Sequence, residues 1–352
     1  MPCSEDANTR ISSPQRRKLL RYMGLSTLAL MLPMPVAALA RTMEIPVTSK
    51  KLLIARLATQ TRIPVAEIES ILADAQFVPS IIERITTPYE SKPYAVYRPL
   101  FVTPGMDKSG REYLAEQRDV FTAVEAKYQV ESEIIAAILG LETRFGRNKG
   151  NDRILDSLYT LASGYPRRSD FFLRELGEFL LLSREEHLDP EKVLGSYAGA
   201  FGATQFIPSS FRAYAVDEDG DGKRDVWNSV PDIIGSVANY FHRHGWEHGR
   251  PVAFWLHGGK NTYNGKIRAR AEAGFNSWTP LAEIRHKLPK LPGIWQDDDK
   301  VALIEMQTEH GQRIALIHYN FYVITRWNRS YNYAMATTEV ASMFGCKTCS
   351  VV

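Results

Sequence analysis

The sequence predicts a mainly α protein of the α+β class, with a helical core, an N-terminal helical subdomain and a small antiparallel β subdomain. Apolar residues recur at helical spacing through most of residues 46–249. Runs rich in β-branched and aromatic residues are confined to residues 252–324. Ahead of both, the first forty residues have the composition of an export signal. We therefore expect an exported, helix-rich protein.

The export signal is predicted for residues 1–40. The basic residues Arg16-Arg17-Lys18 precede an apolar run from Met23 to Ala40 that ends in small side chains. We expect cleavage after Ala40. A membrane anchor is the alternative, but the run contains two prolines and is at the short end of the roughly 20 residues that a spanning helix needs. The paired arginines resemble a twin-arginine signal, and the export route stays open.

Length and charge limit the classes of partner. The chain has 43 basic and 40 acidic side chains, and loss of the first forty residues removes five basic and two acidic ones, which leaves 38 of each. This balance gives no support to nucleic-acid binding. The roughly 310 residues that remain are enough for a sizeable core in two or three subdomains.

Residues 41–105 are predicted to form the N-terminal helical subdomain and a connector. Helical spacing covers residues 46–86, with one helix starting near Val65 and a short one at Ser80–Ile85. Residues 87–105 are rich in proline and tyrosine, cannot form a long helix and are expected to run extended over another surface.

The remaining chain is divided into three segments. Residues 106–249 are the predicted core, with helices at Lys108–Tyr128, Ser132–Phe145, Asp170–Arg184 and Pro231–His244. Residues 250–322 are the predicted β subdomain, with β-rich runs at Val252–Leu256, Val301–Gln307 and Arg313–Ile324. Residues 323–352 include a helix at Asn332–Phe344, which is expected to pack back on the core.

The predicted helix Ser132–Phe145 carries an acidic residue on its apolar face. A helical wheel places Glu142 between Ile138 and Leu139. A carboxyl in apolar surroundings is shifted toward its protonated form, which a general acid near neutral pH requires. A buried ion pair, or an exposed glutamate at a frayed helix end, explains this helix equally well.

A Gly-rich segment, residues 196–210, is the second signal. Its small residues would let the backbone approach a bulky ligand, and Gln205 with the hydroxyl groups would supply the oriented polar groups that a sugar site needs. A tight helix–helix contact is the alternative.

Together, the two segments resemble the lytic murein transglycosylase B family. The resemblance is carried by Ile138-Leu139-Gly140-Leu141-Glu142-Thr143-Arg144-Phe145-Gly146-Arg147 and by the Gly-rich segment ending in Gln205-Phe206-Ile207-Pro208-Ser209-Ser210, and it extends from about Tyr94 to Ala336. It implies a lysozyme-like core, peptidoglycan glycan strands as substrate and Glu142 as the catalytic residue. With the export signal, it implies a periplasmic enzyme.

The family pattern also implies a saccharide cleft. The matching positions are Arg167, Ser196, Gln205 and Tyr240 on one side, Trp327, Asn328 and Tyr333 on the other, and Tyr97 through a shorter motif. Trp327 departs from the tyrosine expected in the best-known members, and an aromatic platform for a sugar face survives that change. Packing in the core is the alternative for each aromatic residue.

The family's chemistry needs one carboxyl group where glycosidases commonly use two. Neither motif contains a second acidic residue. By resemblance, Glu142 protonates the glycosidic oxygen between N-acetylmuramic acid and N-acetylglucosamine, then removes the proton of the muramyl 6-hydroxyl, which gives a 1,6-anhydromuramyl end. No cofactor is expected for catalysis. The rival hypotheses are a muramidase that uses water and a binding or scaffolding module without turnover.

Residues 217–232 resemble an EF-hand calcium loop with acidic residues at the first, third and fifth positions and glycine at the sixth. Asn228 stands at the twelfth position, where a glutamate is usual. In the family, the loop is longer and ends on a later aspartate. The ligands that this implies for a structural Ca²⁺ are Asp217, Asp219, Asp221, the backbone carbonyl of Lys223, and Asp232. A solvated acidic turn is the alternative.

Cys346 and Cys349 are the last two cysteines of the chain, and two thiols are too few for a zinc site. A local disulfide and a pair of free thiols both fit, and no catalytic role is expected. We expect a monomer, and association with other cell-wall enzymes stays open.

Overall fold

The computed structural model describes residues 48–86, 92–257, 262, 263 and 265–351. The predicted export signal lies outside these residues. Within them, no helix is both long enough and apolar enough to span a bilayer.

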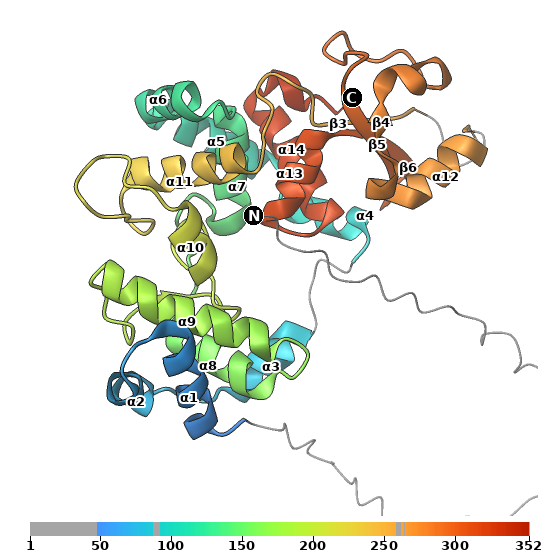
Figure 1. Cartoon of the computed structure of the whole chain (residues 1–352). Coiled ribbons are helices and arrows are strands. Elements are labelled where there is room, and N and C mark those ends of the chain that lie inside the picture. Colours follow the sequence, from blue (N-terminus) through green and yellow to red (C-terminus); the bar gives the residue numbers. More distant parts are fainter. Residues whose placement is uncertain (1–47, 87–91, 258–261, 264, 352) are drawn as a thin grey trace, which may run out of the picture. The chain divides into compact units, whose positions relative to one another are not determined.

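Three N-terminal helices open the described chain (Figure 1): α1 Lys50–Thr61, α2 Val65–Ala73 and α3 Pro79–Thr86. The backbone of Arg62, with φ of 60°, ends α1. Helix α1 packs on α9 (Ser169–Glu185) and α3 packs on α8 (Ile154–Gly164). At Gly177 of α9, a Cβ atom would lie 3.1 Å from Thr61 Cγ2 of α1, a contact tighter than usual. The predicted helices of this region are confirmed.

Residues 94–100 are helical, not extended as predicted. One turn of helix, α4 Tyr94–Tyr97, continues into the 3₁₀ helix η2 Arg98–Leu100. The prolines permit this, because proline is tolerated in the first turn of a helix, where its missing N–H is not needed. Arg98 Nε lies 2.6 Å from Glu339 Oε2, an ion pair that fastens this stretch to the C-terminal helix α14 (Tyr331–Phe344).

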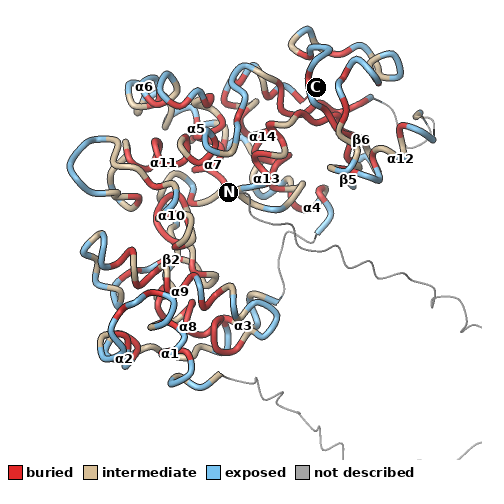
Figure 2. Tube along the Cα trace, in the orientation of Figure 1, coloured by how far each residue is buried: buried red, intermediate tan, exposed pale blue. Residues whose placement is uncertain are grey.

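The central helices surround α7, which is buried at every residue from Ile134 to Leu141 (Figure 2). The predicted helix Lys108–Tyr128 is instead two helices, because the backbone at Gln117 (φ −107°, ψ 25°) leaves the helical region. A two-stranded antiparallel sheet, β1 Asp152–Arg153 with β2 Leu194–Gly195, follows α7. The helices not yet given are α5 Pro104–Glu116, α6 Arg118–Tyr128, α7 Ser132–Thr143, α10 Pro208–Tyr214 and α11 Val230–Arg243.

The four-stranded antiparallel sheet has the order β3-β6-β5-β4. Its long hairpin pairs Thr308 with Gly311, so Glu309 and His310 form a two-residue turn. One face of the sheet contributes Ala302 to the main core, while neighbouring Leu303 belongs to a second cluster of buried side chains. The strands are β3 Ala253–Trp255, β4 Thr279–Pro280, β5 Lys300–Thr308 and β6 Gly311–His318; helix α12 Gly265–Ala273 and the 3₁₀ helices η3 Gly274–Ser277, η4 Leu281–Glu283 and η5 Arg285–Lys287 accompany them.

The predicted β run Arg313–Ile324 is wrong beyond His318, where helix α13 Tyr319–Trp327 begins. His318 Nδ1 accepts a hydrogen bond from the backbone N–H of Asn320 and caps the helix start. Helix α14 follows, close to its predicted bounds, and packs on α7.

The C-terminal tail turns back along β3. The N–H groups of Val252 and Trp255 donate to the carbonyls of Thr348 (3.2 Å) and Val351 (3.0 Å). Cys346 and Cys349 form a disulfide across the 3₁₀ helix η6 Lys347–Cys349. Of the two alternatives left open by the sequence, the structure contains the local disulfide.

Candidate active site

Glu142 is the penultimate residue of α7, where a buried apolar helix reaches a polar end. The helix stops because Arg144 and Phe145 both adopt left-handed backbone conformations, with φ of 50° and 59°. Such conformations cost non-glycine residues of order 1–3 kcal/mol and persist only where the surroundings impose them. Here Phe145 packs against Tyr113 and Phe344. The chain therefore turns away immediately after Glu142 and leaves its side chain at the helix end.

Two neutral donors from different helices hold one oxygen of Glu142. Trp327 Nε1, at the end of α13, lies 2.9 Å from Glu142 Oε1. The Tyr333 hydroxyl, in the first turn of α14, lies 2.6 Å from the same oxygen. Glu142 itself is half-buried, whereas the Tyr333 side chain is buried. The three residues predicted from separate parts of the sequence therefore meet at one carboxyl group.

The Tyr333 hydroxyl keeps its proton and donates it in a hydrogen bond to Glu142. Burial, and next the charge of Glu142, raise the pKa of Tyr333 well above its ordinary value; Tyr97 and Tyr240 contribute in the same direction. A phenol with a raised pKa keeps its proton at neutral pH, so it donates to Glu142 and does not compete with it for charge.

The half-buried ring of Trp327 packs against three aromatic side chains. Its centroid lies 5.1 Å from that of Phe206, 4.8 Å from that of Tyr240 and 5.7 Å from that of Phe241. The Tyr240 hydroxyl donates to the carbonyl of Arg326 at 2.6 Å, which ties α11 to the end of α13. The sequence prediction gave site roles to Trp327 and Tyr240 but none to Phe206, which it quoted only within the Gly-rich motif, or to Phe241, because only the tertiary fold brings these rings together.

The Gly-rich segment is fastened to α7 just after Glu142. The Thr143 hydroxyl donates to the Ala203 carbonyl at 3.0 Å and accepts from the Gly146 N–H at 2.9 Å. Sequence periodicity gave no signal for this role of Thr143, which is buried. Phe206, in the same segment, packs against Trp327. The segment therefore contacts both Thr143, the residue after Glu142, and Trp327, one of the two donors to Glu142.

The glycines of this segment serve internal packing. A Cβ atom at Gly199 would lie 2.4 Å from Leu158 Cδ2, and one at Gly202 would lie 2.7 Å from Val226 Cγ2. Both glycines have positive φ, 86° and 70°, which side chains rarely adopt. At these two positions, the expectation that small residues make room for a ligand is wrong, because the space faces protein atoms.

The predicted polar residues of this side have local partners. Gln205 Nε2 donates to the carbonyls of Lys149 and Gly202, both at 3.1 Å. The Ser196 hydroxyl accepts from the Ala200 N–H at 3.1 Å. Arg167 is exposed in the turn between α8 and α9. Asn328 is half-buried at the C-terminal cap of α13.

The acidic loop, residues 217–232, brings together three of its predicted ligands. Carboxylate oxygens of Asp217, Asp219 and Asp232 lie within 4.8 Å of one another. Asp232 is fully buried, and burial raises its pKa. Asp221 lies outside this trio of carboxylates and accepts from the Lys223 N–H at 2.9 Å.

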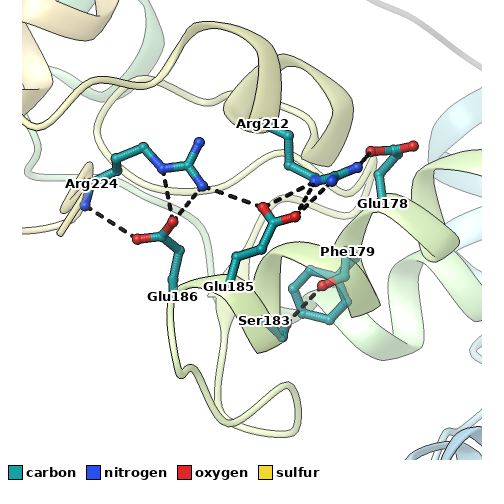
Figure 3. A network of polar contacts seen from close by, with 7 residues as sticks. All are labelled: Glu178, Phe179, Ser183, Glu185, Glu186, Arg212 and Arg224. Carbon is teal, nitrogen blue, oxygen red and sulfur yellow. Dashed lines mark hydrogen bonds and ion pairs between the residues drawn. The ribbon is translucent and has the colours of Figure 1, made fainter. Parts of the chain in front are cut away.

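Contacts join the acidic loop to its neighbours. The Ala203 N–H of the Gly-rich segment donates to the Val226 carbonyl at 2.8 Å, and Lys149 Nζ donates to the Trp227 carbonyl at 2.6 Å. Figure 3 shows a network of ion pairs through which Arg224 of the acidic loop contacts the end of α9. Arg224 pairs with Glu186, and Glu185 is shared between Arg224 and Arg212 of α10.

Comparisons with known proteins identify the family of the chain. Residues 48–342 match the family model described as the transglycosylase SLT domain. Over 252 residues, the chain is 40% identical to the membrane-bound lytic murein transglycosylase B of Escherichia coli (strain K12). That match covers 69% of this chain and 65% of the relative, slightly less than two thirds of the relative's length.

Solved structures give the same family. The soluble lytic transglycosylase SltB1 from Pseudomonas aeruginosa is 38% identical, with a TM-score of 0.74 over 83% of this chain and 97% of that one. The Escherichia coli lytic transglycosylase Slt35 in complex with calcium is 33% identical, with a TM-score of 0.73 over 84% and 91%. SltB3 from Pseudomonas aeruginosa in complex with NAG-NAM-pentapeptide is 29% identical, with a TM-score of 0.74 over 86% and 81%.

From the matched family model and these relatives, it follows that the chain belongs to the transglycosylase SLT domain family and has the lysozyme-like fold of the lytic transglycosylases.

Proposed function

We propose that the protein is a peptidoglycan lytic transglycosylase that cleaves the β-1,4 bond between N-acetylmuramic acid and N-acetylglucosamine. The observation that carries the proposal is the carboxyl group of Glu142 at the end of a buried helix, held through Oε1 by Trp327 and Tyr333. Membership of the SLT family supports it. So does SltB3, whose solved complexes contain NAG-NAM-pentapeptide and NAG-anhNAM-pentapeptide.

In the first step of the proposed reaction, protonated Glu142 acts as the general acid. Its proton moves to the glycosidic oxygen while the bond from that oxygen to muramyl C1 breaks. The Glu142 carboxylate that results is stabilised by the two hydrogen bonds to Oε1. Charge left at C1 has the character of an oxocarbenium ion, which the sugar's own N-acetyl carbonyl can stabilise.

In the second step, the same residue is the general base. The muramyl 6-hydroxyl oxygen forms a bond to C1 while its proton returns to Glu142, so no water is consumed and the product is a 1,6-anhydromuramyl end. One carboxyl group suffices because Glu142 loses its proton in the first step and regains a proton in the second. Tyr97, Arg167, Ser196, Gln205, Tyr240, Trp327, Asn328 and Tyr333 are the residues proposed to line the saccharide site.

The mass of the products tests the reaction class. Purified peptidoglycan incubated with residues 41–352 should release muropeptides with anhydromuramyl ends, detected by mass spectrometry. Products one water heavier, with reducing ends, would show a muramidase instead. Binding of the protein to insoluble peptidoglycan without any released fragment would show a binding module.

We also propose that the acidic loop holds a structural calcium ion. Three carboxylates gathered within 4.8 Å repel one another, and hard oxygen donors of this kind suit Ca²⁺. The calcium complex of Slt35 supports the assignment. Asp217, Asp219 and Asp232 would hold the ion, and Asp221 and the Lys223 carbonyl are the further expected ligands. The ion would brace the Gly-rich segment through the Val226–Ala203 hydrogen bond and take no part in the chemistry.

Calcium should raise the thermal stability of the protein. At a concentration of about 100 times Kd, binding to the folded state alone contributes about 2.7 kcal/mol, which for a chain of this size corresponds to about 5 °C in Tm. Differential scanning fluorimetry with EDTA, then CaCl₂ or MgCl₂, measures this shift. The Asp232→Asn variant should lose most of the response to calcium. An equal shift with both cations, or an unchanged response in the variant, would contradict a dedicated calcium site.

We further propose that the protein is exported to the periplasm, with residues 1–40 removed near Ala40, and that it acts there as a monomer. The substrate carries this proposal, because peptidoglycan lies outside the cytoplasm. The Escherichia coli relative is named a lytic murein transglycosylase, which is consistent with a substrate in the cell wall.

A further inference from the structure

The two donors at Glu142 bind the same oxygen, although they come from different helices. Trp327 Nε1 and the Tyr333 hydroxyl lie 2.9 Å and 2.6 Å from Oε1. A carboxylic acid carries its proton on one oxygen and accepts hydrogen bonds mainly through the other. The hydrogen bonds donated to Oε1 therefore favour the forms of Glu142 in which this oxygen carries no proton.

The direction of the indole is fixed by packing. Indole nitrogen is only a donor, and it is the single polar atom of the tryptophan side chain. The ring of Phe241 is stacked on that of Trp327 with an angle of 13° between the planes, and Phe206 and Tyr240 close in from other sides. A platform for a sugar would use the face of this ring. A role as a sugar platform does not explain why the N–H at the edge of the Trp327 ring points at the carboxyl group of Glu142.

We propose that Trp327 is a positioning residue for Glu142, whose indole N–H acts with the Tyr333 hydroxyl to hold Oε1 in place and to strengthen the acid. This inference rests on the proposed role of Glu142 in catalysis. It adds a function to Trp327 beyond contact with the sugar.

The inference has a pH dependence with a defined sign. The ionisable groups around the pair are Tyr97 of α4, Tyr240 of α11 and Tyr333 of α14, with Arg326 and Arg329 near Tyr240. Tyr240 and Tyr333 both have raised pKa values, so neither loses its proton in the working range. A hydrogen bond donated to a carboxylate favours the ionised form. Loss of the indole donor therefore makes Glu142 a weaker acid, which keeps its proton to higher pH.

The Trp327→Phe variant tests this directly, because phenylalanine keeps an aromatic ring in the same packing and lacks the N–H. We expect kcat to fall about tenfold, KM to stay within about twofold, and the alkaline limb of the pH–kcat profile to rise by about one pH unit. Tyr333→Phe should move the limb in the same direction. Trp246→Phe is the matched control: it makes the same side-chain change but removes an indole donor from Glu131, at the other end of α7, so its alkaline limb should not move.

A readout independent of turnover separates this inference from the proposed function. In ¹⁵N-labelled protein, the Trp327 indole N–H signal, assigned by its loss in Trp327→Phe, should shift with pH as Glu142 ionises. The shift should be absent in Glu142→Gln. A pH-dependent signal in a protein that releases no products would uphold the contact and reject the enzyme. A raised KM with an unmoved pH profile, or an indole signal indifferent to Glu142, would overturn the inference.

Discussion

The Glu142→Gln variant is expected to lose turnover by about 10³-fold or more while it remains folded. Glutamine has the shape of glutamate, and its carbonyl oxygen can still accept the hydrogen bonds from Trp327 and Tyr333. It can neither donate the proton to the leaving oxygen nor take one from the muramyl hydroxyl. Both chemical steps therefore fail for the same reason. Release of soluble fragments from peptidoglycan, followed by liquid chromatography, measures the loss.

The same purified variant should bind insoluble peptidoglycan as the wild type does, and its Tm should stay within about 2 °C of the wild type. A variant that retains more than a tenth of the wild-type rate would show that another group transfers the proton. Loss of binding together with turnover would show that Glu142 holds the substrate and would leave its acid/base role unsupported.

The Glu131→Gln variant should show the reverse: a large loss of stability with turnover retained at temperatures where the protein is folded. Glu131 is 7% exposed at the start of α7, roughly 16 Å along the helix from Glu142. Its carboxylate accepts from Trp246 Nε1 at 2.6 Å and from the Gly249 N–H at 2.9 Å. Glutamine would turn its own NH₂ group toward one of these donors and leave it unsatisfied.

We expect this change to lower the free energy of unfolding by about 2–4 kcal/mol, since buried hydrogen bonds to a charged group are lost. Urea unfolding followed by circular dichroism gives the value. Trp246→Phe removes a single donor to Glu131 and should cost less than Glu131→Gln. A midpoint equal to that of the wild type in Glu131→Gln would show that the carboxylate contributes no net stability.

The helices were predictable where apolar spacing was decisive. The bounds of α7 and α14 follow their sequence patterns within a few residues. The boundary at His318 was not predictable in this way, because β-branched and aromatic residues continue across it from Ile314 to Ile324. A side chain decides it: His318 Nδ1 binds the Asn320 N–H and starts a helix where β propensity would continue the strand.

The candidate active site was also predictable only in part. The residues around Glu142 were predicted through family resemblance, and the structure brings Trp327 and Tyr333 to its carboxyl group. The kind of contact was not predictable, because an indole can present either its face or its N–H. Phe206 and Phe241 decide between them by packing. Likewise, the sequence shows where Gly199 and Gly202 are, but only the fold shows that Leu158 and Val226 occupy the space beside them.

The hydrogen bonds at Glu142 join residues 185 and 191 positions apart in the chain. During translation, α7 emerges long before α13 and α14, and contacts of such long range form only after the intervening chain is available. A partly synthesised chain therefore contains Glu142 without the Trp327 and Tyr333 donors. The group of contacts around Glu142 is therefore complete only when α13 and α14, the last α-helices of the described chain, have docked on the core.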